Sequence, residues 1–156
     1  MLCIYRQMEK NGREMNYMKD KVFLDSNILV YCSDGNDIQK QNMARTLIES
    51  LVRKNKGQIS TQTLQEFFHV VTRKLKNSKE DTKKDVEKYA KIFPVHTNTL
   101  KDILLAISIS IKTQFSFYDS LIIAAAKAEG CSIVYSEDLN DGQTVDGVKI
   151  VNPFKE

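Results

Sequence analysis

The chain has 156 residues, enough for one domain with a buried core and too few for two separate ones. Hydrophobic residues make up 42% and charged residues 28%, and no apolar run approaches the roughly 20 residues of a membrane span, so we predict a globular protein without a membrane partner. The formal net charge of +3 is mild for a protein that binds nucleic acid.

Residues 1–19 carry charges throughout and lack the continuous hydrophobic segment of a signal peptide. We interpret them as an N-terminal extension outside the fold, with the domain at residues 20–156. The cysteines, Cys3, Cys32 and Cys131, are an odd number without Cys-x-x-Cys spacing. Buried thiols are therefore predicted rather than disulfides or zinc ligands, which indicates the cytoplasm.

A short apolar run, Val22-Phe-Leu, has the pattern of a strand buried on both faces, and it stops at a carboxylate, Asp25. Ser26 and Asn27 can cap or turn the chain before apolar residues resume in a helix. Ligands bind beyond the carboxyl ends of strands in open α/β sheets, which makes Asp25 a candidate for chemistry. The alternative is that Asp25 only caps the helix.

Helices and short strands alternate over the next part of the chain. Residues 38–56 have apolar positions at helical spacing, and Gly57 is expected to close that helix. A short strand at 58–60 precedes a helix over 61–75. Glu66 lies away from the centre of the apolar face of this helix, so amphipathicity alone predicts that it is exposed to solvent.

The most charged segment, 77–91, predicts a solvated helix, and a short strand at 95–97 follows it. The next helix, 99–115, carries large apolar residues at helical spacing, and we predict that this stripe faces the core. The stripe consists of Leu100, Ile103, Leu104, Ile107 and Ile111.

The segment 120–129 is apolar on every side and predicts a helix buried all round. A β-rich run at 131–135 is followed by acids, including Asp138, and a last strand lies around 149–151. Strands that alternate with helices imply a parallel sheet covered on both faces. We therefore predict a three-layer α/β/α fold with a central, mostly parallel sheet of four to five short strands.

Carboxylates recur where these elements meet. Asp25 follows the first strand, Asp119 opens the buried helix and Asp138 follows the fourth strand. Each also has a structural explanation, respectively as a helix cap, as part of a capping box with Ser116 and as the opening of a turn. Gathered at one sheet edge, such carboxylates would repel one another and attract a divalent cation, and oxygen-only ligands favour Mg²⁺ or Mn²⁺ over zinc.

Four segments resemble, in order and spacing, the conserved blocks of the PIN-domain ribonucleases. They are Val22-Phe-Leu-Asp-Ser-Asn-Ile-Leu-Val-Tyr, Ser60-Thr-Gln-Thr-Leu-Gln-Glu-Phe, Phe117-Tyr-Asp-Ser-Leu-Ile-Ile-Ala-Ala-Ala and Val134-Tyr-Ser-Glu-Asp-Leu-Asn-Asp-Gly. The size is that of the VapC-type toxins. The resemblance implies a PIN-like fold and Mg²⁺- or Mn²⁺-dependent endonucleolytic hydrolysis of RNA that leaves 5′-phosphate and 3′-hydroxyl ends.

The resemblance also implies the site residues. The catalytic and metal-binding acids would be Asp25, Glu66, Asp119 and Asp138. Glu66 rests on the resemblance alone, because periodicity did not place it in a pocket. Asp141 is a candidate for a further acid, Glu137 is expected to face solvent, and Asn27 and Ser136 are expected to orient the site by hydrogen bonds.

Basic residues at helix ends are candidates for contacts with RNA phosphates, although such clusters are usually only solvated faces. The two candidate clusters are Arg73, Lys74 and Lys76, and Arg53, Lys54 and Lys56. His69 and His96 have no partner at ligand spacing and are interpreted as ordinary polar residues.

By the same resemblance, the partners would be RNA, a VapB-like antitoxin and a second copy of the chain. Helices between Leu64 and Phe93 are expected to form a groove for an antitoxin peptide, and Leu105 and Ile109 to contribute to a homodimer. The groove prediction rests on an excess of apolar residues, Phe67, Phe68, Val70 and Val71.

Two other functions compete with this interpretation. A noncatalytic PIN-like module that binds RNA or protein is less consistent with the presence of all four acids. A nuclease that acts on DNA flaps would carry additional helical elements, which this chain lacks.

Overall fold

The computed structural model describes residues 21–155, so the predicted N-terminal extension and Cys3 lie outside the described residues. One sheet has the strand order β3-β2-β1-β4-β6-β5, and all neighbouring strands are parallel except β5 and β6. The strands are β1 (Val22–Leu24), β2 (Gly57–Ser60), β3 (Val95–His96), β4 (Ile133–Tyr135), β5 (Thr144–Val145) and β6 (Val148–Val151). The mostly parallel sheet is confirmed, and β5 is an additional strand between β4 and β6 in the chain.

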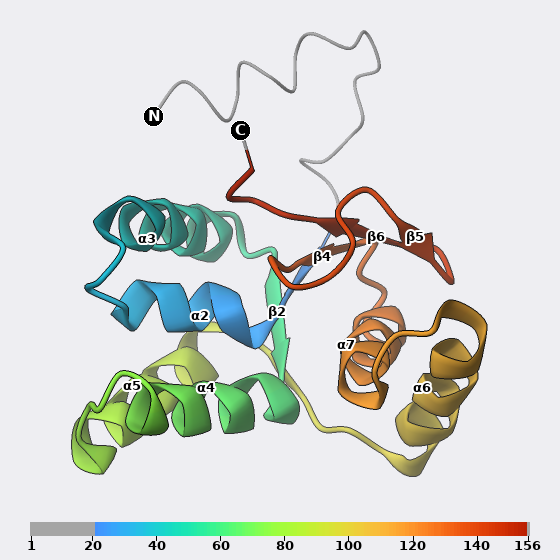
Figure 1. Ribbon diagram of the computed structural model, residues 1–156, viewed down its shortest axis with the longest axis horizontal. Helices are drawn as coiled ribbons and strands as arrows, with labels where there is room; N and C mark the ends of the chain where they lie inside the picture. The colour runs from blue at the N-terminus through green and yellow to red at the C-terminus, as the bar shows by residue number, and fades with distance from the viewer. Residues whose placement is uncertain (1–20, 156) are drawn as a thin grey trace, which may run out of the picture.

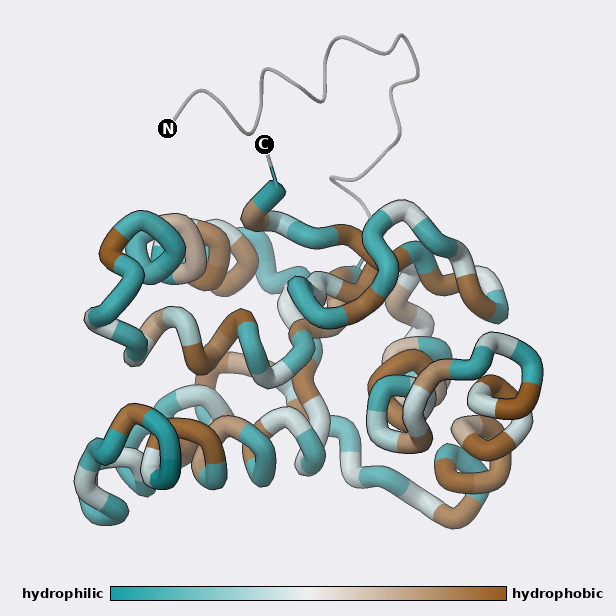
Figure 2. The backbone as a smooth tube through the Cα atoms, viewed as in Figure 1, coloured by the Kyte–Doolittle hydropathy of each residue, from teal (hydrophilic) through white to brown (hydrophobic). Residues whose placement is uncertain are grey.

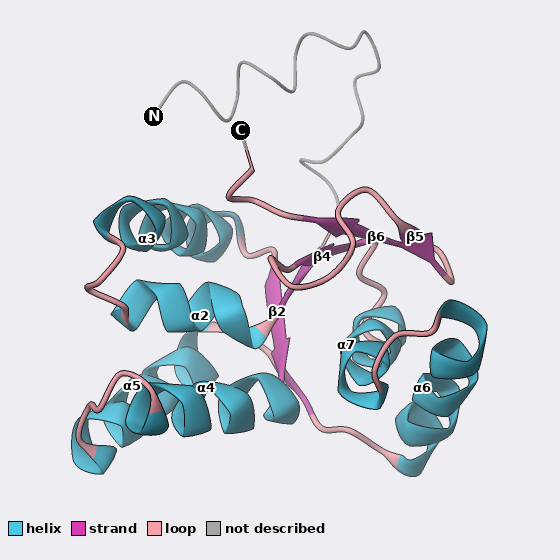
Figure 3. Ribbon diagram, in the orientation of Figure 1, coloured by secondary structure: helices cyan, strands magenta, loops and turns pink. Residues whose placement is uncertain are grey.

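Helices cover both faces of this sheet, which confirms the three-layer prediction. Helices α2 to α5 lie on one side and α6 and α7 on the other (Figures 1 and 3). The helices are α2 (Ser26–Ser33), α3 (Ile38–Lys54), α4 (Thr61–Arg73), α5 (Lys79–Ile92), α6 (Leu100–Thr113) and α7 (Phe117–Ala128). Within residues 21–155, none of the helices has the length and apolar content to cross a membrane. Cys32 and Cys131 are buried free thiols, as predicted.

Strand β1 lies in the middle of the sheet and contributes to both cores. Val22 and Leu24 pack with α2 to α5, whereas Phe23 packs with α6 and α7. This alternation follows from the two-residue period of a strand and explains why the whole run is apolar. The end of β1 is therefore fixed from both sides, and Asp25 is the residue that follows it.

The end of α3 differs from the prediction. Asn55, in the left-handed conformation with φ 53°, caps this helix, and Gly57 begins β2 instead of closing α3. A Cβ atom at Gly57 would lie 2.3 Å from the ring of Phe93. The strand therefore needs glycine here, because the Phe93 ring packs directly against the backbone. Asparagine tolerates the left-handed region well enough to serve in the role expected of glycine.

The apolar stripe of α6 faces outward, which corrects the prediction that it faces the core. Ala106 and Ile109 are buried and Leu105 packs against the same core. The exposed fractions of the stripe are 69% for Leu100, 38% for Ile103, 57% for Leu104, 44% for Ile107 and 71% for Ile111. Helix α7, buried from Ser120 to Ala126, occupies the space next to the sheet, so α6 packs against α7 through its other face. A row of aliphatic side chains is thus left on the surface of α6. Figure 2 shows hydrophobic positions along the backbone of this helix.

His96 joins β3 to both helices on the second face of the sheet. Its Nδ1 lies 2.7 Å from Glu129 Oε1 at the end of α7, and its Nε2 lies 2.9 Å from Asp102 Oδ2 in the first turn of α6. A neutral imidazole has one N–H group, so bonds to both carboxylates require the protonated ring. Burial lowers the pKa of His96, but the two carboxylates outweigh it and raise the pKa above its ordinary value.

This arrangement makes the stability of the fold depend on pH. A histidine pKa that is raised in the folded state gives stabilisation that is complete below the unfolded-state pKa of about 6.5 and lost as the pH rises through the folded-state value. We expect the urea midpoint of the wild type to fall more between pH 6 and pH 8.5 than that of His96→Gln. The difference between the two proteins cancels other titrating groups, and equal pH slopes would contradict a charged His96.

Candidate active site

Asp25 is buried, with 6% of its surface exposed, and its two carboxylate oxygens have different partners. Oδ1 accepts a hydrogen bond of 2.6 Å from the backbone N–H of Ser26 and caps α2. Oδ2 accepts from Ser136 Oγ at 2.7 Å and from Asn27 Nδ2 at 3.2 Å. The cap and the candidate site thus use the same side chain, and one oxygen is directed toward the segment that follows β4.

Glu66 lies beside Asp25, although the amphipathic pattern of its helix predicted exposure to solvent. Its Oε2 accepts a hydrogen bond of 2.8 Å from Ser26 Oγ, and its Oε1 accepts one of 2.7 Å from Gln62 Nε2. The pattern of α4 gave no sign of this, because the partners that draw the carboxylate inward are polar. The location agrees with the position that the family resemblance gave to Glu66.

Asp138 lies on the loop after β4, and Asn27 connects it to Asp25. Asn27 Nδ2 donates to Asp138 Oδ2 at 3.1 Å, and Ser136 Oγ accepts from the backbone N–H of Asp138 at 3.2 Å. The register of the parallel pair β1 and β4 matches Leu24 with Tyr135, so the residues that follow each strand become neighbours. Asn27 and Ser136 therefore lie between the two acids that follow these strands.

Asp119 is in the first turn of α7, and its backbone N–H donates to Ser116 Oγ at 3.1 Å, as in the predicted cap. The connection of this turn to the other acids runs through Gln62, whose Nε2 donates to the carbonyl oxygen of Tyr118 at 3.0 Å. Gln62 therefore contacts both Glu66 and the residue before Asp119. Sequence reasoning missed Gln62 and assigned Ser26 only a capping role.

Two further acids have partners of their own. Glu137, which was expected to face solvent, is half-buried, forms an ion pair with Lys40 and accepts a hydrogen bond from the Tyr31 hydroxyl. Asp141 accepts a hydrogen bond of 2.8 Å from the backbone N–H of Asn152 and pairs with Lys155 at 3.6 Å. Glu137 thus anchors the loop that carries Asp138, and Asp141 holds the C-terminal segment.

The surroundings of Asp25 disfavour its charge. Burial raises the pKa of Asp25 to about 6, the hydrogen bond from Ser136 opposes this, and the nearby carboxylates of Glu66 and Asp138 raise the pKa further. A carboxylate in such surroundings is stabilised by a bound cation, because the cation relieves both the desolvation and the repulsion.

The donor set fits a hard divalent cation, because Asp25, Glu66 and Asp138 offer only oxygen atoms. Within residues 21–155, no three acidic, histidine or cysteine side chains lie close enough together to enclose a metal ion. Mg²⁺ does not require such a cage, since it keeps several water molecules and is usually held by one or two carboxylates. The arrangement is therefore compatible with a hydrated, hard divalent cation.

The basic clusters lie away from these acids. Arg73, Lys74 and Lys76 are exposed at the far end of α4, and Arg73 is roughly 10 Å along the helix axis from Glu66. Lys56 accepts a backbone hydrogen bond from Val22, so its cluster lies near the amino end of β1, opposite the edge that carries Asp25. A contact of the first cluster with RNA stays a prediction.

A comparison with models of protein families covers the segments that contain these acids. The family model of the PIN domain matches residues 22–141, which include all five predicted acids. No curated protein matches the chain in sequence.

Several solved structures share the fold. A sarcin–ricin loop cleaving toxin of Mycobacterium tuberculosis, VapC20, is 16% identical with a TM-score of 0.61, over 76% of this chain and 90% of that one. A toxin–antitoxin complex from Klebsiella pneumoniae is 15% identical with a TM-score of 0.65, over 87% of this chain and 100% of that one. The DNA-bound VapBC of Salmonella typhimurium is 18% identical with a TM-score of 0.63, over 83% of this chain and 96% of that one.

Proposed function

The chain belongs to the PIN domain family, and on this basis we propose that it is a divalent-metal-dependent endoribonuclease, the toxin of a cytoplasmic toxin–antitoxin pair. The observation that carries the proposal is the linkage of Asp25, Glu66 and Asp138 through the short polar side chains of Ser26, Asn27 and Ser136. Acids so connected at the carboxyl edge of a parallel sheet are suited to phosphodiester hydrolysis.

In this proposal each acid has the role of a metal ligand. Asp25, Glu66 and Asp138 would hold a hydrated Mg²⁺ or Mn²⁺ ion, in part through its water molecules, and Asp119 would contribute from the first turn of α7. The bound ion supplies activation of a water molecule and neutralisation of charge that develops on the phosphate. Ser136 keeps Asp25 in place from the segment after β4, and the raised pKa of Asp25 means that ion binding competes with a proton below about pH 6.

Incubation of the purified protein with total RNA tests the proposal. We expect cleavage with Mg²⁺ or Mn²⁺, its loss with EDTA, and its return when either ion is added in excess. The 5′ ends of the products identify hydrolysis, because they should carry phosphate. Binding of RNA without cleavage would favour the noncatalytic module, and cleavage that persists in EDTA would exclude this site chemistry.

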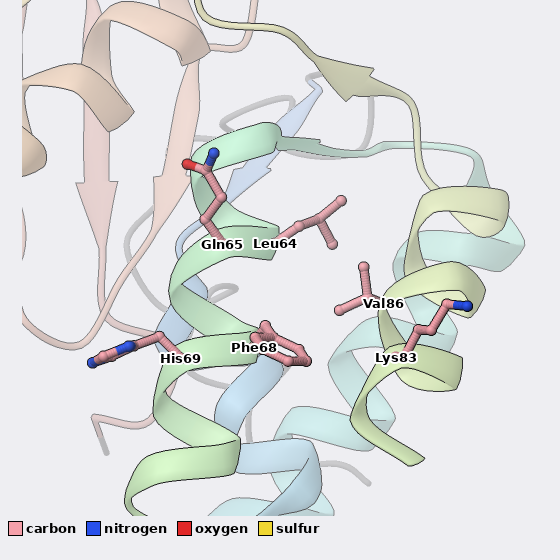
Figure 4. A pocket seen from close by; sticks show the side chains of 6 residues that line it. All are labelled: Leu64, Gln65, Phe68, His69, Lys83 and Val86. Atoms are coloured by element: carbon pink, nitrogen blue, oxygen red, sulfur yellow. The ribbon is translucent and has the colours of Figure 1, made fainter. Parts of the chain in front are cut away.

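An antitoxin is the proposed protein partner, and the groove between α4 and α5 is its proposed binding site. The groove has a volume of about 490 Å³ and is lined by Leu64, Gln65, Phe68, His69, Lys83 and Val86. Leu64 and Phe68 point from α4 toward Val86 of α5 (Figure 4). Its lining differs from the prediction, because Phe67 and Val71 are fully buried in the core. Structures of toxin–antitoxin complexes with this fold support such a partner.

Phe68→Ser is expected to weaken inhibition by the antitoxin by about 30-fold or more, the scale of a buried aromatic anchor at an interface. Phe68 is only half-buried in the free protein, so the folded state should survive. The measurement is the antitoxin concentration that halves RNA cleavage. Val70→Ser changes the same helix outside the groove and should leave that concentration unchanged. Equal effects of the two variants would contradict this groove as the binding site.

The second proposed partner is another copy of the chain, docked on the exposed row of α6. The row runs from Leu100 to Ile111, roughly 16 Å along the helix. Exposed aliphatic side chains gathered in this way are typical of interaction surfaces. We therefore keep the homodimer as a proposal but assign its contact to the exposed face of α6. Leu105 and Ile109, which were predicted to form the contact, pack inward.

A further inference from the structure

Gln62 is a buried amide next to the candidate site, with 4% of its surface exposed. Its Nε2 donates to two acceptors, Glu66 Oε1 at 2.7 Å and the carbonyl oxygen of Tyr118 at 3.0 Å. An amide nitrogen has two hydrogens, so both donors of this side chain are used. The contacts also fix the orientation of the amide, because both partners accept hydrogen bonds.

The opposite end of the same amide is less well satisfied. Gln62 Oε1 is buried, and no donor within residues 21–155 bonds to it. A buried acceptor without a partner lowers stability, and an apolar side chain of the same length would avoid that cost. Glutamine at this position therefore contributes little to the stability of the fold. Its main contribution is the hydrogen bond to the carboxylate of Glu66.

The acids of the site reach it in two different ways. Asp25 and Asp138 follow paired parallel strands closely, whereas Glu66 lies further along α4, the helix after β2, and Asp119 lies in α7, which follows another helix. Gln62 bonds to Glu66 and to the residue before Asp119, so it links α4 to the first turn of α7. Ser26 holds the second oxygen of Glu66.

We propose that Gln62 is a positioning residue that holds Glu66 in place for the metal ion and aligns it with the turn that carries Asp119. This inference rests on the proposed function. A fixed carboxylate binds an ion more tightly, because the ion does not have to order the side chain first, and loss of such an outer partner typically weakens metal binding about 10–100-fold.

Gln58 provides a matched control elsewhere in the fold. It is 2% exposed, and its Nε2 donates to the carbonyl oxygens of Pro94 at 3.1 Å and Ile59 at 3.3 Å. It is therefore a buried amide with two acceptors, like Gln62, but neither acceptor is a carboxylate. Replacing either glutamine by methionine removes the same groups from a similar environment.

The test compares wild type, Gln62→Met and Gln58→Met in melting experiments with increasing Mn²⁺. We expect the Mn²⁺ concentration needed for a given rise in melting temperature to increase 10–100-fold for Gln62→Met and to change less than twofold for Gln58→Met. Cleavage of RNA should require the same increase in Mn²⁺. If Gln62→Met does not fold, Gln62→Asn replaces it in the test. This variant keeps the donors but is one methylene shorter, and it should show the same 10–100-fold increase.

A double variant separates positioning from general loss of stability. If Gln62 acts through Glu66, Gln62→Met should weaken Mn²⁺ binding in the wild type but not in Glu66→Gln. If Gln62→Met and Gln58→Met need equal Mn²⁺ concentrations for the same rise in melting temperature and the protein cleaves RNA, the inference is overturned and the proposed function stands. A wild type with neither a Mn²⁺-induced rise nor cleavage would overturn both.

Discussion

Asp25→Asn is expected to abolish RNA cleavage while the metal-free protein becomes as stable as the wild type or more stable. The substitution removes an anionic ligand from the proposed metal site, and we expect a loss of at least about 100-fold, the scale of removing one preorganised electrostatic group. The amide still has an oxygen that can accept from the backbone N–H of Ser26, so asparagine can continue to cap α2.

The gain in stability follows from the raised pKa of Asp25. Because the folded state raises this pKa from 3.8 to about 6, folding is weakened as the pH rises from about 4 to above 6, by up to roughly 3 kcal/mol. Asparagine carries no charge and avoids this penalty, although it loses the charge-assisted bond from Ser136. We expect a net gain of about 1 kcal/mol at pH 7.5, or roughly 2–4 °C in melting temperature for a chain of this size.

Melting curves with and without Mg²⁺ check both parts of this expectation. Mg²⁺ should stabilise the wild type by binding the folded state and should barely shift Asp25→Asn. Asp141→Asn is the control, because Asp141 bonds to the C-terminal segment and should keep both the Mg²⁺ response and cleavage. An Asp25→Asn variant that retains its Mg²⁺ response and its activity would leave Asp25 as a helix cap alone.

Replacing Leu104 and Ile107 together by lysine is expected to convert the proposed homodimer to a monomer. The two side chains are 57% and 44% exposed in the single chain, so the substitutions should leave the fold intact. In a dimer they would be buried, and the loss of two anchors of about 2 kcal/mol each would raise the dissociation constant roughly 1,000-fold.

Light scattering at tens of micromolar protein gives the oligomeric state directly. Lys101→Ser changes an exposed position on the same helix outside the row and should remain dimeric. Unchanged mass of the double variant would exclude α6 as the contact, and a wild type that is monomeric at these concentrations would exclude the dimer itself.

The sequence was informative where a local rule decides the structure. The strand β1 could be predicted because a run without polar residues suits the centre of a parallel sheet. The caps at Asp25 and Ser116 could be predicted because short polar side chains satisfy the first N–H groups of a helix. It failed for α6, which has two apolar faces. Periodicity identifies such faces but cannot tell which of them α7 will cover.

The site follows the same division. Asp25 and Asp138 could be found because they follow predicted strands, and parallel strands bring their carboxyl ends to one edge. Glu66 needed the family resemblance, because its position depends on partners from other parts of the chain. His96 lies 33 residues from Glu129, and Ser26 lies 40 residues from Glu66, so neither contact leaves a local pattern.

The placement of β1 between β2 and β4 has a consequence for the order of folding. Ser136 and Asp25 are bonded across 111 residues of sequence, whereas β1, β2 and β3 can pair from the first part of the domain. At about 5–20 residues per second, a ribosome needs roughly 6–20 seconds to add the intervening segment. During this time one edge of β1 remains open and Asp25 lacks the hydroxyl that holds it. A nascent chain therefore cannot assemble the site until β4 has been synthesised and has docked beside β1.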